Sequence, residues 1–380
     1  MNISVVVGLG FGDEGKGATV NSLCTDHLNT LVIRFNGGHQ VGHTAVHNNI
    51  RHPFSNFGSG TLKGVPTYWS EYCTVNPLAV LKEGDVLREQ GVIPIVFYNS
   101  NAMVTTPYDI LYNLSNNTIL NHGSVGVGFG STIQRNEDLY HLYVRDLQFP
   151  AIRDEKLRQI KKYYFDKTGN IQLASNKMNE LIEEFKSACD DLVKRFSIVG
   201  TQHEIHALLN SGWNLIFEGG QGIMLDQNYG FFPHVTRSNT TSKNAIEIIN
   251  NYVTEIYILD TYYITRAYQT RHGNGFMSNE GRDISYIKIN PNETNVDTGS
   301  QGIFRRTVLD LDLLKYAVNC DKCHNSLASD NHLVITCMDH VGDKIPATKE
   351  GIFKNFIPLE VGAVIGVRDV ILSNSDKGFA

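Results

Sequence analysis

The stretch that decides the fold is ISVVVGLGFGDEGKGATVNSL, residues 3–23. The apolar run at its start predicts a buried strand, a glycine-rich loop follows at residues 8–17, and residues 18–23 can continue as a helix. Glycines let backbone N–H groups converge on phosphate oxygens, and Lys16 adds a mobile positive charge. The pattern predicts a site for a nucleotide polyphosphate. It is not a Walker A loop, because Gly17 rather than Ser or Thr follows Lys16.

Composition excludes several classes of protein. The 380 residues are 41% hydrophobic and 19% charged, which is typical of a folded chain with a large core. The net charge of −6 supplies no positive field for nucleic acid or a membrane surface. No apolar run approaches the roughly 18 residues of a membrane span, and the first residues lack the basic lead of a signal peptide. We therefore expect a soluble cytoplasmic protein whose six cysteines are reduced thiols.

Further apolar runs rich in β-branched residues predict more buried strands. They lie at Leu31–Phe35, Val92–Phe97, Asn214–Phe217, Val253–Leu259 and His332–Thr336. Amphipathic patterns between them, clearest from Met178 to Phe196, predict helices. The alternation predicts an α/β fold, a single domain over residues 1–380 with a central, mostly parallel sheet flanked by helices. Loops rich in Gly, Ser and Asn at 123–131, 219–242 and 292–307 are expected to form the substrate pocket.

Asp13 and Glu14 are unusual in a phosphate loop, because carboxylates repel phosphates unless Mg²⁺ intervenes or they handle a proton on a second substrate. The alternative is a plain glycine-rich turn that carries this acidic pair on its surface. A second motif, RFNGGHQVGHT at residues 34–44, favours chemistry. His43 is a candidate for stabilising a transferring phosphoryl group, whereas His39 is a candidate for a loop hydrogen bond.

The combination of GDEGKG at residues 12–17 and GGHQVGHT at 37–44 resembles the adenylosuccinate synthetase family. Later segments agree with this resemblance. They are FEGGQG at 217–222, VTRSNTT at 235–241, DTG at 297–299 followed by RRT at 305–307, and TCMD at 336–339. The resemblance spans most of the chain and implies that family's P-loop-related fold.

The family joins L-aspartate to C6 of a 6-oxopurine nucleotide through a 6-phosphoryl intermediate, with magnesium (Mg²⁺) and a nucleoside triphosphate. By resemblance, Asp13 is the base that removes the N1 proton, His43 stabilises O6 and the phosphoryl group, and Asp13 and Gly42 hold Mg²⁺. The phosphate donor would contact Gly12, Glu14, Gly15, Lys16, Gly17, Gly42, Thr44 and Asp339. The purine monophosphate would contact Asp13, Gln40, Ser124, Gln221 and Thr236, and L-aspartate would contact Thr298, Gly299 and Arg305. The resemblance also implies a homodimer.

Departures from the family pattern cluster around substrate recognition. Ser300 stands where the family has an arginine that reaches the ribose hydroxyl, His272 replaces a valine, Gln40 replaces an asparagine and Cys337 replaces a lysine. No confident match exists for the arginine that the family lends across its dimer interface, for which Arg135 and Arg145 are nearby candidates.

In these departures, the chain resembles the phage branch of the family (PurZ-type), which makes a 2-aminoadenine precursor from dGMP with ATP or dATP. We therefore predict N6-succino-2-amino-2'-deoxyadenylate as the product, formed in the host cytoplasm if the chain is phage-encoded. The alternative is an IMP-specific enzyme that uses GTP, which the retention of Asp13 favours. A second alternative is a catalytically silent nucleotide-binding regulator, which would need neither Asp13 nor His43. The motif CDKCH at residues 320–324 is interpreted as ordinary thiols at a helix end.

Overall fold

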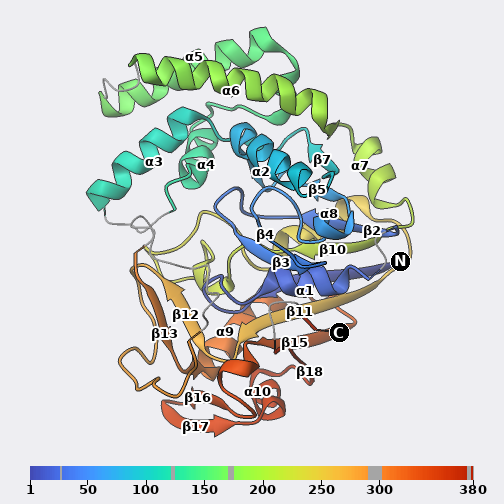
Figure 1. Ribbon diagram of the computed structural model, residues 1–380, viewed down its shortest axis with the longest axis vertical. Coiled ribbons are helices and arrows are strands. Elements are labelled where there is room, and N and C mark those ends of the chain that lie inside the picture. The colour runs from blue at the N-terminus through green and yellow to red at the C-terminus, as the bar shows by residue number, and fades with distance from the viewer. Residues whose placement is uncertain (26–27, 121–124, 170–174, 290–301, 375–377, 380) are drawn as a thin grey trace.

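The computed structural model of the chain describes residues 1–25, 28–120, 125–169, 175–289, 302–374 and 378–379. At its centre lies a nine-stranded sheet in the order β18-β15-β11-β1-β10-β2-β5-β7-β9, and every neighbouring pair is parallel (Figure 1). The strands are β1 (Asn2–Gly8), β2 (Thr30–Arg34), β5 (Thr67–Trp69), β7 (Val96–Asn99), β9 (Ser197–Val199), β10 (Asn214–Glu218), β11 (Ile258–Arg266), β15 (Asp330–Thr336) and β18 (Asp369–Leu372). The prediction of a mostly parallel sheet flanked by helices is confirmed.

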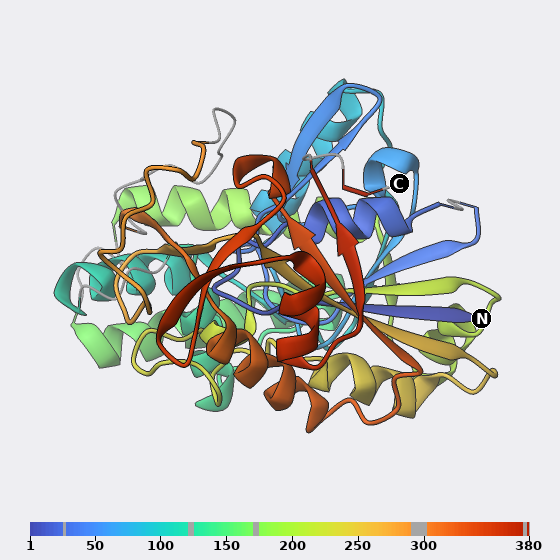
Figure 2. The same ribbon diagram turned by 90° about the horizontal axis from the view of Figure 1, so that it is seen from below.

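Helices cover both faces of the sheet. They are α1 (Lys16–Leu23), α2 (Pro77–Glu89), α3 (Pro107–Leu120), α4 (Phe129–Glu137), α5 (Pro150–Thr168), α6 (Asn176–Arg195), α7 (Gln202–Leu209), α8 (Lys243–Tyr252), α9 (Leu311–Lys322) and α10 (Pro358–Ile365). Figure 2 shows α1 on one face of the central strands, with α8 and α9 on the other. The C-terminal segment returns to α1, where the backbone N–H of Phe379 donates to Ser22 Oγ at 3.0 Å.

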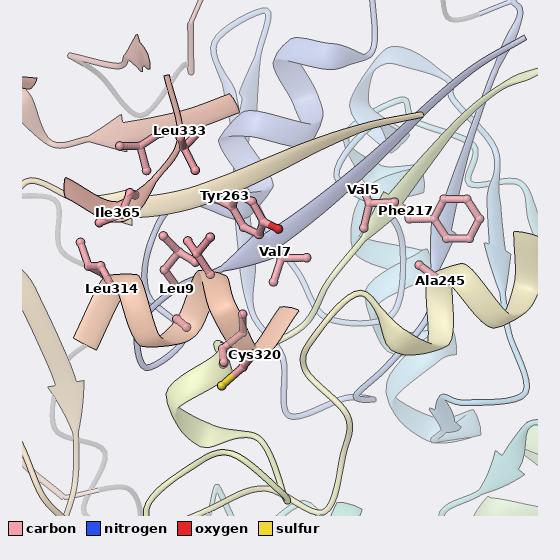
Figure 3. Close-up of a cluster of buried hydrophobic side chains, with 14 of the residues drawn as sticks. Val5, Val7, Leu9, Phe217, Ala245, Tyr263, Leu314, Cys320, Leu333 and Ile365 are labelled. Atoms are coloured by element: carbon pink, nitrogen blue, oxygen red, sulfur yellow. The ribbon is translucent and has the colours of Figure 1, made fainter. Parts of the chain in front are cut away.

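The alternation of side chains in β1 explains this layering. Val5 and Val7 point to the face covered by α8 and α9, where they join Phe217 and Tyr263 in one buried cluster (Figure 3). Val6 points to the opposite face and packs with Val20 of α1. Since both faces of β1 are buried, none of its three consecutive valines faces solvent, as expected for a central parallel strand.

A second hydrophobic cluster lies under the outer strands, between β5 and β7 and the helices α2, α5 and α6 (Figure 1). The smaller sheets are a β3 (His43–His47) and β4 (Ile50–Phe54) hairpin, a β12 (Gln269–His272) and β13 (Phe304–Thr307) pair, β6 (Thr74–Val75) with β8 (Met103–Val104), and β14 (Leu309–Asp310) with β16 (Ile345–Lys349) and β17 (Ile352–Phe356). Four short 3₁₀ turns complete the described elements, at Thr61–Lys63, Val144–Gln148, Ile223–Leu225 and Met338–His340.

Most predicted elements are found with shifted ends, and two predicted strands are largely wrong. The run Val92–Phe97 is a strand only from Val96, where β7 begins after Pro94, a residue without an N–H group for the sheet. The run Val253–Leu259 is a strand only at its end, because the Val253 N–H still donates to Ile249 O at 2.9 Å and thus terminates α8. The strand begins at Ile258, where it pairs with Asn2, and continues through polar residues to Arg266. The predicted helix at Met178–Phe196 is α6, and the six cysteines are free thiols as predicted.

The parallel sheet brings the carboxyl ends of β1, β2, β10, β11 and β15 to one edge. The loops that follow these strands carry most of the residues singled out in the sequence, as expected for ligand sites in parallel α/β sheets. Among the residues described, no helix combines the length and the apolar character that crossing a bilayer requires.

Candidate functional site

The loop between β1 and α1 forms an anion cradle. Gly12 and Gly15 have φ angles of 113° and 93°, a region that favours glycine. The N–H groups of Gly10 and Gly12 donate to Glu14 Oε1 at 3.0 and 2.7 Å, and Lys16 Nζ donates to Glu14 Oε2 at 2.7 Å. Two backbone donors and an ammonium group therefore converge on one carboxylate, which is the donor set that suits a phosphate.

Glu14 and Lys16 are buried, with exposed fractions of 4% and 1%. The alternative interpretation of Asp13 and Glu14 as a surface acidic pair is therefore wrong. Lys16 Nζ also donates to Gly12 O at 2.9 Å, and Thr336 Oγ1 from the end of β15 donates to Glu14 O at 2.7 Å. The chain's own carboxylate thus lies among the groups predicted to hold the phosphate donor.

Asp13 lies beside this cradle, close to Arg266 and His272. Arg266 Nε, at the end of β11, donates a hydrogen bond to the backbone O of Asp13. His272 Nε2, at the end of β12, lies 3.7 Å from Asp13 Oδ2, which is buried and has no hydrogen-bond partner among the described residues. Burial raises the pKa of Asp13, while Arg266 and His272 oppose the rise. A largely buried carboxylate with a raised pKa and an unused oxygen is suited to accept a proton from a ligand.

His43, the first residue of β3, is held by Glu218 at the end of β10. The ring Nδ1 lies 2.7 Å from Glu218 Oε1, and both side chains are buried. Glu218 also accepts hydrogen bonds from the N–H of Ser59, at 3.0 Å, and from the Ser59 hydroxyl. Because Nδ1 faces the carboxylate, Nε2 points elsewhere, and it is buried without a partner among the described residues. Burial lowers the pKa of His43 against the opposing effect of Glu218, so the ring of the free protein is neutral at pH 7.

Two glutamines complete a set of buried polar atoms without partners. Both polar atoms of the Gln40 side chain and Oε1 of Gln221 are buried and lack a hydrogen bond within the described part of the chain. Asn36 joins their loops, because its Oδ1 accepts from Gly220 N at 2.6 Å and its Nδ2 donates to Asn239 O at 2.9 Å. Buried polar atoms are normally paired, so this group indicates a ligand site.

The remaining predicted phosphate-side residues lie around the cradle. A Cβ atom at Gly17 would lie 2.9 Å from the Cβ of His43, so this glycine permits the contact between α1 and β3. Thr44 follows His43 in β3, and Gly42 is exposed just before it. Asp339 follows β15 in a 3₁₀ turn, and its side chain is 48% exposed. Thr236, predicted to contact the purine nucleotide, is buried and donates its N–H to Leu225 O at 2.8 Å.

Only part of the predicted L-aspartate site lies within the described residues. Thr298, Gly299 and Ser124 lie outside the described residues. Arg305 lies in β13, where Nη1 donates to Glu280 at 2.9 Å and Nη2 donates to the backbone O atoms of Gly273 and Gly275 at 2.6 and 2.9 Å. Its guanidinium group therefore holds the connection after β12 in this conformation, and its predicted contact with L-aspartate stays a prediction.

The structure separates the two arginines considered for the interface role. Arg135 is fully buried and its Nε donates to Asp109 Oδ1 at 2.8 Å, so it cannot reach another subunit. Arg145 is exposed, and its guanidinium lies 4.3 Å from the ring centroid of Tyr143. Only Arg145 is placed where a second copy of the chain could contact it.

Sequence reasoning missed Glu218, Arg266 and Arg34. Glu218 lies inside the FEGGQG motif, which was the available signal for its importance. Arg34 is fully buried in β2 and contributes a positive charge near the His43–Glu218 pair. Arg266 carries no local signal, since only the pairing of β11 with β1 brings it to Asp13. The cradle, the unpartnered Asp13 oxygen and the His43–Glu218 pair together define the site of an enzyme that acts on nucleotides.

Comparison with known proteins identifies the family of this enzyme. Residues 5–345 match the family model described as adenylosuccinate synthetase, so the chain belongs to the adenylosuccinate synthetase family, ligases that form a C–N bond with a nucleoside triphosphate. The adenylosuccinate synthetase of Borrelia turicatae (strain 91E135) is 29% identical over 354 residues, which cover 89% of this chain and 77% of that protein. Family membership supports the ligase over the silent regulator.

Two solved structures share the fold. The fully ligated adenylosuccinate synthetase from Plasmodium falciparum superposes with a TM-score of 0.78 at 16% identity, covering 99% of this chain and 98% of that one. The succinoaminodeoxyadenylate synthetase (PurZ) of cyanophage S-2L, bound to dGMP and to dATP as energy donor, gives a TM-score of 0.65 at 15% identity, covering 99% and 93%. At these identities, the likeness shows the architecture alone.

Proposed function

We propose that the protein joins L-aspartate to dGMP, with ATP or dATP as phosphate donor, and forms N6-succino-2-amino-2'-deoxyadenylate. The observation that carries this choice of substrate is Ser300, which stands where the family has an arginine that contacts the ribose hydroxyl. A nucleotide without a 2'-hydroxyl needs no such contact.

The first step is phosphorylation of O6. Asp13 accepts the N1 proton of the purine through its unpartnered Oδ2, and the electron pair moves to O6. O6 then attacks the γ-phosphorus, the bond from this phosphorus to the bridging oxygen breaks, and the nucleoside diphosphate leaves. Burial of Asp13 raises its pKa, which makes the carboxylate a stronger base for this proton.

His43 acts on O6 of the purine and on the transferring phosphoryl group. Glu218 fixes the ring by accepting from Nδ1, so Nε2 faces the transferring phosphoryl group. When an anion arrives at Nε2, the ionised Glu218 balances the positive charge of a protonated ring. In the second step, the amine of L-aspartate attacks C6, the C6–O6 bond breaks, and the phosphate that leaves takes up the proton lost by the amine.

The residues present fit a magnesium ion. Oδ1 of Asp13, the carboxylate oxygen that does not take the N1 proton, and the carbonyl of Gly42 are hard oxygen donors, as Mg²⁺ prefers. Within the described residues, no group of three or more His, Cys, Asp or Glu side chains could hold a metal ion, so phosphate oxygens would complete the coordination. When bound, Mg²⁺ would neutralise phosphate charge and favour attack at the γ-phosphorus.

The second candidate is an IMP-specific adenylosuccinate synthetase that uses GTP. The name of the Borrelia turicatae relative supports it. Asp339 supports it as well, since an exposed carboxylate at the end of β15 can accept from both N1–H and the 2-amino group of guanine in the donor. The two candidate functions therefore differ in both the purine monophosphate and the phosphate donor.

Product analysis separates these candidates. We would incubate the purified protein with Mg²⁺, L-aspartate and each of dGMP, GMP, dIMP or IMP, paired with ATP, dATP or GTP, and identify products by mass. The proposed function predicts succinylated dGMP with ATP or dATP. Succinylated IMP formed with GTP would replace the proposal with the second candidate. Omitting the monophosphate should abolish triphosphate cleavage in either case, because the ligase couples the two substrates.

A further inference from the structure

His272 is a polar residue beside Asp13 that takes no part in the two steps above. Its ring Nε2 lies 3.7 Å from Asp13 Oδ2, and both ring nitrogens are buried without a hydrogen-bond partner among the described residues. The ring packs on Phe304, its partner across the β12–β13 pair, with centroids 4.9 Å apart. A histidine whose orientation is fixed in this way, but whose nitrogens are unused, is expected to meet a partner in a ligand.

The distance to Asp13 supports a role beside that residue. A separation of 3.7 Å is too long for a hydrogen bond between His272 and Asp13, so the two groups do not satisfy each other. It is short enough for both to reach neighbouring atoms on one edge of a base.

The topology shows which edge of the purine His272 would face. β12 follows β11, which lies on one side of β1, whereas β3 follows β2, which lies beyond β10 on the other side (Figure 1). His272 and His43 therefore approach the loop of Asp13 from opposite sides. N1 of the purine is flanked by C6 and C2. If Asp13 takes the N1 proton and His43 serves O6, His272 faces the substituent at C2.

We propose that His272 recognises the 2-amino group of the purine monophosphate and so determines the preference for a guanine over a hypoxanthine base. A neutral imidazole has one acceptor nitrogen, which can accept a hydrogen bond from the exocyclic amine while Asp13 accepts from N1–H. Hypoxanthine has only a C–H bond at C2 and leaves this nitrogen unpaired. The inference rests on the proposed function, since it names the group that selects dGMP within that same site.

The test compares dGMP with dIMP, which differ only in the 2-amino group. In His272→Val, which carries the residue typical of the family, we expect kcat/KM for dGMP to fall at least about ten-fold while kcat/KM for dIMP stays within about three-fold of its original value. His272→Gln, whose amide oxygen can replace Nε2 as acceptor, should recover part of the preference. His203→Val, at an exposed position of α7, is the matched control and should change neither value.

Three results would overturn the inference. One is an equal fall for dGMP and dIMP in His272→Val, which would mean that His272 only positions Asp13; another is an unchanged ratio. A third is a wild-type preference for dIMP over dGMP. The proposed function fails separately, because it is lost already if the wild-type protein makes no succinylated dGMP. Thermal unfolding of each variant and its binding of the triphosphate alone establish that the chain is folded.

Discussion

The phosphate cradle and the purine side of the site differ in whether their polar groups already have hydrogen-bond partners. In the cradle, Gly10, Gly12 and Lys16 already donate to a carboxylate of the chain itself, Glu14. On the purine side, Asp13, His43, Gln40, Gln221 and His272 each keep a buried polar atom without a partner among the described residues. The cradle is therefore satisfied before a ligand arrives, whereas the purine side carries a desolvation cost that a ligand would relieve.

The two nucleotides are therefore expected to bind in different ways. A triphosphate must displace Glu14 from the cradle, so its affinity is a difference between two anions that compete for the same donors. A purine fills positions that nothing else occupies, so each contact it makes adds to affinity.

Asp13→Asn should have the largest effect. The amide cannot accept the N1 proton, so we expect kcat to fall by about 10³-fold or more while the monophosphate still binds. Turnover and calorimetric titration with dGMP measure these two quantities. The free energy of unfolding should not fall, because the substitution removes a buried carboxylate whose pKa burial raises. Residual activity above a tenth of wild type would show that another group is the base.

Glu218→Gln should reduce kcat by about 10²-fold, because His43 then lacks a negative charge to balance protonation of its ring. Ser59→Ala is the control on the same network. It removes one of the two hydrogen bonds that Ser59 donates to Glu218 and leaves the one from the Ser59 N–H, so its effect should stay below about ten-fold. Equal effects of the two variants would mean that position rather than charge matters.

The sequence predicted the two halves of this comparison unequally well. Strand β1, its glycine loop and α1 are contiguous, so local pattern was enough to place Lys16 and the loop glycines. The neighbours of Asp13 come from β11 and β12, more than 250 residues along the chain, and only strand pairing brings Arg266 and His272 beside it. Glu14 was predicted to serve the donor, but its occupation of the cradle depends on side-chain geometry that no spacing encodes.

Glu14→Ala tests the phosphate cradle, in which the donors are already paired with Glu14. If Glu14 only competes for the cradle, the variant should bind a non-hydrolysable ATP analogue about three- to ten-fold more tightly, because Gly10, Gly12 and Lys16 become available. Calorimetric titration measures the change, and dGMP affinity in the same variant serves as the control. Weaker binding of the analogue would show instead that Glu14 contacts the donor directly, as the family resemblance implies.

Glu280→Gln should have the smallest effect, and it tests the aspartate side. Arg305 Nη1 donates to Glu280 at 2.9 Å, and the glutamate side chain is 55% exposed, so this ion pair is weak. If Arg305 binds L-aspartate, releasing its guanidinium group should lower KM for L-aspartate by about two- to three-fold without changing kcat.

Arg305→Lys separates the roles further, because a lysine lacks the paired donors that suit a carboxylate. It should raise KM for L-aspartate about ten-fold if Arg305 binds the substrate. An unchanged KM together with a lower melting temperature would assign Arg305 to anchoring the connection after β12, through Gly273 and Gly275.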